Sequence, residues 1–220
     1  MRAILFDWDG TLVDSLGAFQ HANAAVMAAF GLPWDEAIYR RHYVPDWRLM
    51  YLNLGVPRDR LDEANELWHT TFAGAEDVIA FEGVAGALAR LDAVGCGLGI
   101  VTAGDRVIVE PQLARTGLGT LLPIRVFGDD LAVHKPDPAP LRRALELLGL
   151  ADATDEVAYV GDAPTDMRMA RAVGVRAIGI ASVVGDPDEL REAGADEVAS
   201  TVAAWVEGFV AGLASDRTAP

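Results

Sequence analysis

Two aspartates near the start of the chain, Asp7 and Asp9, have the type and spacing that most clearly suggest chemistry. They follow the apolar run 3–6, which predicts a short strand buried on both faces, and turn residues begin at Gly10. Residues two apart on an extended chain point the same way, so both carboxylates project from the carboxyl end of that strand. Two like charges this close need a cation or a proton beside them, which indicates a hard metal such as Mg²⁺. The alternative is a hydrophilic strand end that caps the next helix.

Further reactive side chains follow two later apolar runs. Thr102 and Ala103 come after the run 98–101, and a hydroxyl and backbone N–H groups there could bind phosphate oxygens, although any threonine that ends a strand offers the same. Asp162 and Asp166 lie four residues apart across a strand-to-helix turn. Either acid alone would be interpreted as a helix cap. Together with the first two aspartates they make four carboxylates, which suits a metal site better than four independent caps.

Lys135 is the single lysine among the 18 lysines and arginines of the chain. It lies just before a predicted helix, in the sequence His134-Lys135-Pro136-Asp137. The chain supplies its ordinary surface charge with arginine, whose planar guanidinium does not reproduce the compact charge of an ammonium. We therefore interpret Lys135 as a functional residue that Asp166 can reach, against the alternative of a chance surface lysine.

The elements that must position these residues are of two kinds. Residues 15–80 show helical spacing of apolar side chains, and no strand pattern interrupts them. From Gly83 onward, apolar strands alternate with helices, which predicts an α/β fold with a doubly wound, parallel, Rossmann-like sheet. We expect residues 1–14 and 81–220 to form an α/β catalytic core, with residues 15–80 inserted as a helical cap.

The turn and capping residues set the expected bounds of individual elements. Strands are expected near 3–6, 98–102, 124–127, 157–160 and 177–180. Helices are expected near 15–30, 35–43, 47–54, 59–75, 84–94, 107–116, 138–148, 165–172, 187–193 and 201–213. Ser200 is expected to cap the last helix.

Bulk composition narrows the class of protein. A chain of 220 residues with 51% hydrophobic and 23% charged residues is typical of a globular protein with a sizeable core. The net charge of −15 argues against binding to nucleic acid or to an anionic membrane, and no apolar run has the length of a membrane span. The single cysteine excludes an intrachain disulfide. Asp7 and Asp9 interrupt any N-terminal signal-like segment, so we expect a cytoplasmic protein.

Four segments resemble, in order and spacing, the four motifs of the haloacid dehalogenase-like hydrolases. They are residues 7–11, Thr102, residues 135–136 and residues 161–166. The resemblance covers nearly the whole chain, including the helical cap inserted after the first motif. Asp14-Ser15 and the run 159–172 look most like the phosphoglycolate phosphatase-like branch. Many relatives carry asparagine after the threonine of the second motif, where this chain has Ala103, so the detail of oxyanion binding stays open.

The resemblance implies a Mg²⁺-dependent phosphatase that hydrolyses a small-molecule phosphate monoester through an aspartyl-phosphate. Asp7 would be the nucleophile. Asp9 would protonate the leaving oxygen and then act as a base on the hydrolytic water. The metal would be held by the carboxylates of Asp7 and Asp162 and by the backbone carbonyl of Asp9.

The remaining motif residues would bind and orient the transferring group. Thr102, Ala103 and Lys135 would hold the phosphoryl oxygens, and Asp166 would orient Lys135 or a metal-bound water. Thr11 would support the site from the first motif. The implied partner is a small phosphorylated metabolite, and the sequence leaves open whether the protein is a monomer or a homodimer.

Individual sequence features favour or oppose alternative functions within and outside this family. The dehalogenases lack the second carboxylate of the first motif, so Asp9 argues against that branch. The phosphonatases use a Schiff-base lysine from the cap, and this cap contains no lysine. A β-phosphoglucomutase-like sugar phosphomutase stays open because it uses the same aspartate pair. A phospho-acceptor signalling or binding module without turnover is the alternative from a different class, and the large insertion counts against it.

The predicted cap holds a positive island in an acidic protein. Between residues 36 and 58 there are four arginines and two acids, namely Arg40, Arg41, Arg48 and Arg58 against Glu36 and Asp46. Most of these charges are expected to be solvated. Arg48 is our candidate for a specificity residue because it follows Pro45-Asp46 at the start of a helix.

Overall fold

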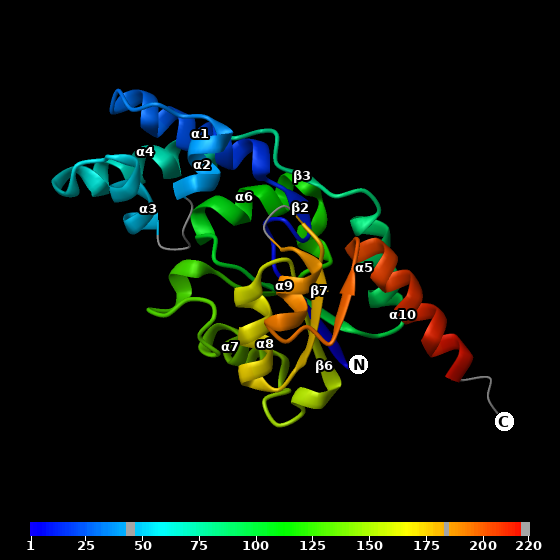
Figure 1. Cartoon of the computed structure of the whole chain (residues 1–220). Helices are drawn as coiled ribbons and strands as arrows, with labels where there is room; N and C mark the ends of the chain where they lie inside the picture. The colour runs from blue at the N-terminus through cyan, green and yellow to red at the C-terminus, as the bar shows by residue number, and fades with distance from the viewer. Residues whose placement is uncertain (43–46, 183–184, 217–220) are drawn as a thin grey trace. The chain divides into compact units, whose positions relative to one another are not determined.

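The computed structural model describes residues 1–42, 47–182 and 185–216 (Figure 1). Residues 43–46, where the second predicted helix ends and the Pro45-Asp46 pair lies, are outside the described residues. The chain divides into two compact units. The core unit is Met1–Asp14 with Ile79–Pro220, and the helical unit is Ser15–Val78.

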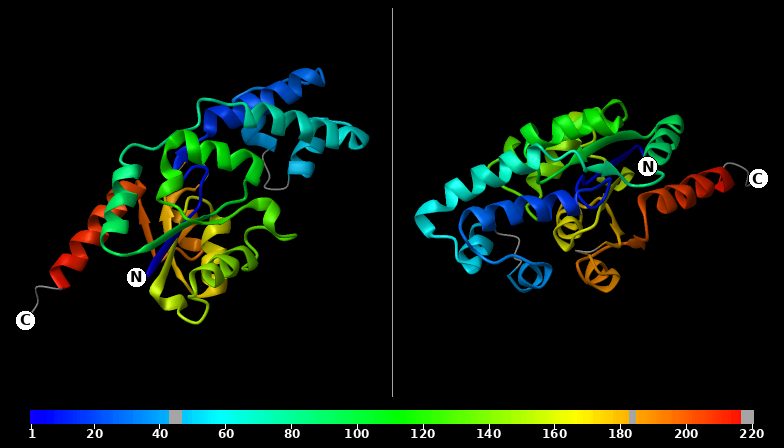
Figure 2. Two further views of the ribbon diagram at one scale, coloured as in Figure 1. Left: turned by 180° about the vertical axis from the view of Figure 1, so that it is seen from behind. Right: turned by 90° about the horizontal axis from the view of Figure 1, so that it is seen from above.

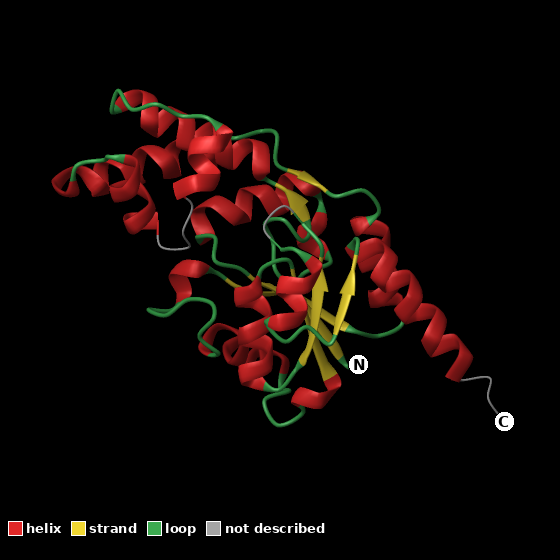
Figure 3. Ribbon diagram, in the orientation of Figure 1, coloured by secondary structure: helices red, strands yellow, loops and turns green. Residues whose placement is uncertain are grey.

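A six-stranded sheet in the order β5-β4-β1-β6-β7-β8 forms the middle of the core unit, and every pairing in it is parallel (Figure 3). All residues of β1 and β6 are buried, as expected for strands covered on both faces. This confirms the predicted parallel α/β sheet. The strands are β1 Ala3–Phe6, β4 Gly97–Val101, β5 Ile124–Val126, β6 Val157–Gly161, β7 Arg176–Ile180 and β8 Glu197–Ala199.

Helices cover both faces of this sheet. Leu141 of α7, Met167 of α8 and Leu190 of α9 share one apolar cluster with Leu5 and Tyr159 of the sheet. On the other side α5 packs against β4 and α10, as the two opposite views show (Figures 1 and 2). The helices are α5 Val84–Ala93, α6 Arg106–Thr116, α7 Ala139–Leu148, α8 Pro164–Val173, α9 Pro187–Glu192 and α10 Val202–Asp216, with short 3₁₀ turns at Leu118–Thr120, Gly128–Asp130 and Thr154–Glu156.

A two-stranded antiparallel ribbon lies in the core unit where the chain leaves for the helical unit and returns from it. It pairs β2 (Val13–Asp14) with β3 (Ile79–Ala80). The expectation that no strand interrupts residues 15–80 was therefore wrong at its last two residues. A strand of two residues is too short to show an alternating pattern in the sequence.

The helical unit contains α1 (Leu16–Ala29), α2 (Glu36–His42), α3 (Trp47–Leu54), a 3₁₀ turn at Arg58–Arg60 and α4 (Leu61–Ala73). Its interior is apolar and aromatic. The Phe19 ring meets Trp68 edge-on at 5.4 Å between centroids, and Trp68 stacks on Phe72 at 4.7 Å. The Tyr51 hydroxyl donates a buried hydrogen bond to Asn23 Oδ1 at 3.1 Å.

Two local expectations near the end of the chain need correction. The last helix begins at Val202, and the hydroxyl of Thr201, rather than that of Ser200, accepts the backbone N–H of Ala204 at 3.0 Å. The short strand β8 was not predicted because its three residues carry no strong apolar alternation. Within the described part of the chain, no helix has the length and apolarity to cross a membrane.

Candidate active site

The carboxyl ends of three neighbouring strands carry predicted site residues. Asp7 follows β1, Thr102 follows β4 and Asp162 follows β6, and all three are buried. Because β1 pairs in parallel with both β4 and β6, the three residues start from the same edge of the sheet. In open α/β sheets this is the edge where ligands bind.

Lys135 reaches this edge from the loop before α7. Its Nζ donates to Asp7 Oδ1 at 2.6 Å and lies 2.8 Å from Asp166 Oδ1. The lysine side chain is only 7% exposed, and its Nζ lies 5.4 Å from the centre of the Tyr159 ring. A buried ammonium is strongly destabilising unless it is paired, and here two carboxylates pair with it. The ion pair joins residues 128 positions apart in the sequence.

Asp166 is fixed by contacts on both carboxylate oxygens. Oδ2 accepts the backbone N–H of Ala163 at 3.0 Å, and the Tyr159 hydroxyl lies 3.3 Å from Oδ1 while donating to the Val101 carbonyl at 2.8 Å. A Cβ at Gly161 would lie 2.5 Å from this carboxylate, so the strand end must be glycine for Asp166 to take this position. Tyr159, which sequence reasoning placed only in a buried strand, is thus part of the site.

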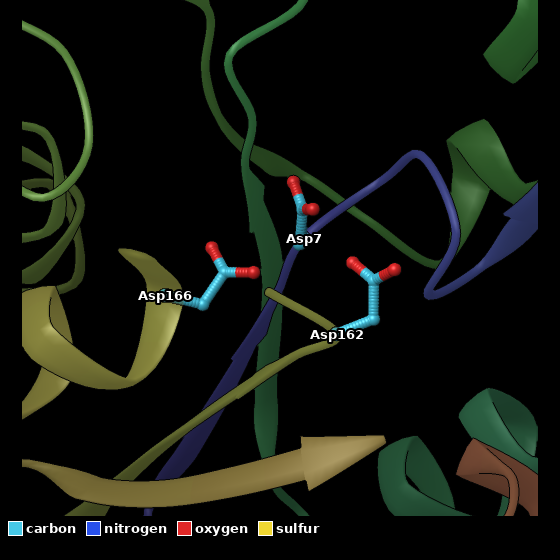
Figure 4. Close-up of side chains that lie close together, drawn as sticks. All are labelled: Asp7, Asp162 and Asp166. Carbon is cyan, nitrogen blue, oxygen red and sulfur yellow. The ribbon is translucent and has the colours of Figure 1, made fainter. Parts of the chain in front are cut away.

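Three carboxylates gather at this edge. Asp7, Asp162 and Asp166 offer oxygens that all lie within 4.8 Å of one another, and Figure 4 shows the three side chains close together. Burial, with added repulsion from Asp166 and Asp162, raises the pKa of Asp7 well above its usual value against the opposing effect of Lys135. Burial, followed by repulsion from Asp166, raises the pKa of Asp162 to about 7.

The charge balance favours a further cation. Burial alone would lower the pKa of Lys135, but Asp166 and Asp7 raise it above its usual value, so the ammonium stays charged. One ammonium among three buried carboxylates leaves an excess of negative charge. The donor set consists of oxygens, which hard divalent cations such as Mg²⁺ prefer. The residues present therefore fit a bound divalent cation.

Asp9 and the loop after β4 lie close together. The backbone N–H of Gly104 donates to Thr102 Oγ1 at 3.0 Å. A Cβ built on Gly104 would lie 2.7 Å from Val109 and 3.6 Å from Asp9 Oδ2, so a side chain there would crowd the loop. Ala103, the residue that departs from many relatives, is exposed.

Asp162 has two hydroxyl partners, of which one was predicted to support the site. Thr11 Oγ1 lies 3.4 Å from Asp162 Oδ1, and Ser182 Oγ donates to Asp162 Oδ2 at 2.7 Å. Ser182 was missed. The available signal was its place two residues after β7, at the same edge of the sheet as Asp162.

Trp8 and Arg48 make contacts of other kinds. Trp8, between the first two aspartates, is fully buried and donates from Nε1 to Gln112 Oε1 of α6 at 2.7 Å. Arg48, the predicted specificity residue, lies in the helical unit with its side chain exposed and its guanidinium 4.3 Å above the Trp47 ring. Its part in substrate binding stays a prediction.

Comparison with known proteins defines the class. A family model described as haloacid dehalogenase-like hydrolase matches residues 4–180. The chain belongs to this family. The solved structure of a haloacid dehalogenase-like family hydrolase from Streptococcus pneumoniae has the same fold, with a TM-score of 0.84 and 22% identity, covering 95% of this chain and 98% of that one.

Curated relatives narrow the class to one branch. The chain is 36% identical to the plasmid-encoded phosphoglycolate phosphatase of Cupriavidus necator, over 79% of this chain and 78% of that protein. It is 37% identical to the phosphoglycolate phosphatase of Rhodospirillum rubrum, over 79% of this chain and 77% of that protein. The chain is a phosphoric monoester hydrolase of the phosphoglycolate phosphatase-like branch.

Proposed function

We propose that the protein hydrolyses a small-molecule phosphate monoester in a Mg²⁺-dependent reaction, with Asp7 as the nucleophile. One observation carries the proposal. Asp7 lies 2.6 Å from a buried ammonium and shares its surroundings with two further carboxylates, Asp162 and Asp166, at the ligand-binding edge of the sheet. With a divalent cation to offset the raised pKa of Asp7, this arrangement would supply an anionic nucleophile beside a fixed positive charge, where a phosphoryl group can be held.

Asp7 and Asp9 divide the covalent chemistry. The Asp7 carboxylate attacks phosphorus, the bond to the leaving oxygen breaks, and Asp9 gives that oxygen its proton. Asp9 then takes a proton from the water that attacks phosphorus of the aspartyl-phosphate. The second step releases inorganic phosphate and restores both aspartates.

The transferring phosphoryl group needs donors for its oxygens. Lys135 supplies an ammonium that Asp7 and Asp166 hold in one place. Thr102 supplies a hydroxyl, and the backbone N–H of Ala103 supplies a donor that does not depend on the residue type at that position. Thr11 supports the site through Asp162. Donors that are already oriented before the reaction stabilise the developing charge most effectively.

The divalent cation would be held by the carboxylates of Asp7 and Asp162 and by the backbone carbonyl of Asp9. When bound, Mg²⁺ supplies positive charge that offsets both the clustered carboxylates and the phosphate oxygens. The raised pKa values of Asp7 and Asp162 support this assignment because they report buried negative charge that lacks full compensation.

The names of two curated relatives support a choice of substrate class. Two proteins more than a third identical to this chain are named phosphoglycolate phosphatases, which supports 2-phosphoglycolate as the first compound to test. We assign the helical unit, Ser15–Val78, the role of a cap that selects among substrates, and the core unit the role of the catalytic domain.

The test is phosphate release from a panel of phosphorylated metabolites and one aryl phosphate, with Mg²⁺ or with EDTA. We expect turnover of a small phosphate monoester in Mg²⁺, no turnover in EDTA, and recovery when Mg²⁺ is restored. Full turnover in EDTA contradicts the metal site. Isomerisation of a sugar phosphate without release of phosphate would favour the phosphomutase instead.

A further inference from the structure

Ser182 forms a defined hydrogen-bond network beside the proposed metal site. Its Oγ lies 2.7 Å from Asp162 Oδ2, and the backbone N–H of Gly185 donates to the same Oγ at 3.2 Å. The backbone N–H of Ser182 donates to the Gly185 carbonyl at 3.1 Å. An ionised carboxylate only accepts hydrogen bonds, so the hydroxyl of Ser182 donates its proton to Asp162 when Asp162 is ionised.

The Asp162 side chain is confined from several directions. Ser182 contacts one carboxylate oxygen and Thr11 lies 3.4 Å from the other. A Cβ at Gly10 would overlap the Asp162 carboxylate, and a Cβ at Gly185 would overlap the Asp162 backbone carbonyl. Two glycines thus allow the backbone to approach Asp162 closely, and Ser182 makes the shorter of the two hydroxyl contacts that set the plane of the carboxylate.

We infer that Ser182 is a positioning residue that holds the Asp162 carboxylate in the orientation needed to bind the divalent cation. This inference rests on the proposed function, in which Asp162 is a metal ligand. Ser182 touches neither the substrate nor the reacting atoms in that scheme. It acts through Asp162 by removing the freedom of the carboxylate to rotate. Partners of this kind behind a metal ligand typically change metal affinity about 10–100-fold when they are lost.

The test measures metal binding directly in the substrate-free protein. The affinity for Mn²⁺, a spectroscopic substitute for Mg²⁺, is determined by electron paramagnetic resonance for the wild type, Ser182→Ala and Ser182→Thr. We expect Ser182→Ala to raise the Kd for Mn²⁺ about 10-fold or more, and Ser182→Thr to recover most of the affinity because it keeps the hydroxyl.

The matched control is Thr116→Ala, which also removes a hydroxyl hydrogen bond from the core unit. Thr116 Oγ1 donates to the backbone carbonyl of Gln112 at 2.9 Å, within α6, and we expect the Mn²⁺ affinity of Thr116→Ala to match the wild type. Steady-state assays add a second readout. Ser182→Ala should need about 10-fold more Mg²⁺ for half-maximal rate, with kcat at saturating Mg²⁺ close to that of the wild type.

The possible outcomes separate this inference from the proposed function. If the wild type and Ser182→Ala bind Mn²⁺ equally, the positioning role is wrong and the metal site stands. If the wild type binds no Mn²⁺ at all, the metal site is wrong and the role of Ser182 is wrong with it. If both Ser182 variants lose affinity together with their cooperative thermal unfolding, Ser182 supports the fold and the inference is overturned.

Discussion

The sheet edge of the core unit and the surface of the helical unit hold ion pairs that differ in burial. At the sheet edge of the core unit, Lys135 is almost completely buried between two carboxylates. In the helical unit, Arg60 and Glu63 form an ion pair at 2.6 Å, but their side chains are 45% and 57% exposed. Surface pairs of this kind contribute little to stability, whereas buried charges cost several kcal/mol unless they are paired.

This difference shows where the chain gives up stability for function. Among its described residues, the interior of the helical unit contains edge-on and stacked aromatic rings and a buried tyrosine–asparagine hydrogen bond, an arrangement that serves packing. The interior of the core unit at the sheet edge holds Asp7, Asp162 and Asp166 within a few ångströms of one another. Apolar side chains at this edge would stabilise the folded state more than clustered carboxylates do. The carboxylates are therefore better explained by chemistry than by packing.

The largest expected effect is that of Asp7→Asn. An amide is not a nucleophile here, so we expect kcat to fall by about 10⁴-fold or more while the fold is kept. Phosphate release and thermal unfolding measure the two effects. The control is Asp186→Asn, which makes the same change at an exposed helix cap whose side chain accepts the N–H of Asp188 at 2.9 Å. If Asp7→Asn retained most of the activity, Asp7 would not be the nucleophile.

A smaller but still severe effect is expected for Lys135→Arg. The charge is kept, but a planar guanidinium is larger and cannot reproduce the two contacts of a compact ammonium in a buried site. We expect kcat/KM to fall about 10²–10³-fold, the range seen when a fixed donor at a developing charge is lost.

A substitution at an exposed ion pair is the control for Lys135→Arg. Arg176→Lys changes an exposed ion pair with Glu197 in the same unit, and its kcat/KM should stay within about twofold of the wild type. If Lys135→Arg behaved like Arg176→Lys, burial would not distinguish the two sites, and Lys135 would be an ordinary ion pair.

The smallest effect is expected in the helical unit, for Arg48→Ala. If this unit selects the substrate, losing an exposed arginine should raise KM for an anionic metabolite about 10-fold with little change in kcat. An aryl phosphate without a second anionic group should be affected less. Arg58→Ala, at another exposed arginine of the unit, is the control. An equal fall in kcat/KM for both substrates would mean that Arg48 supports the fold. No change for either substrate would mean that Arg48 does not contact the substrate.

The parts of the site that could be predicted from sequence are those that depend on strand ends. Asp7 and Asp162 follow buried apolar runs, and parallel strands bring their carboxyl ends to one edge, so their meeting requires no knowledge of loops. Lys135 could be singled out because it is the single lysine in an arginine-rich chain. The alternation of strands and helices gave the sheet for the same reason, since buried strands are strongly marked by their apolar residues.

The parts that could not be predicted depend on contacts between side chains from loops and helices. Ser182 follows the end of β7, and its hydroxyl meets Asp162 Oδ2 through a side-chain contact that no periodic pattern in the sequence marks. The hydrogen bond between Trp8 and Gln112 joins residues 104 positions apart, and neither residue type signals the other. The β2–β3 ribbon involves two residues in each strand, which is too few for a periodic pattern.

Trapping the phosphorylated aspartate tests covalent catalysis by Asp7 directly. The Asp9→Asn variant is mixed with Mg²⁺ and an aryl phosphate whose leaving group needs little acid help, so that the phosphoenzyme forms but loses its general base for hydrolysis. Borohydride reduction of the acyl phosphate followed by peptide mass spectrometry then identifies the modified residue. We predict homoserine at position 7. Reduction at another residue, or release of phosphate by the wild type with no trapped intermediate in the variant, would contradict covalent catalysis by Asp7.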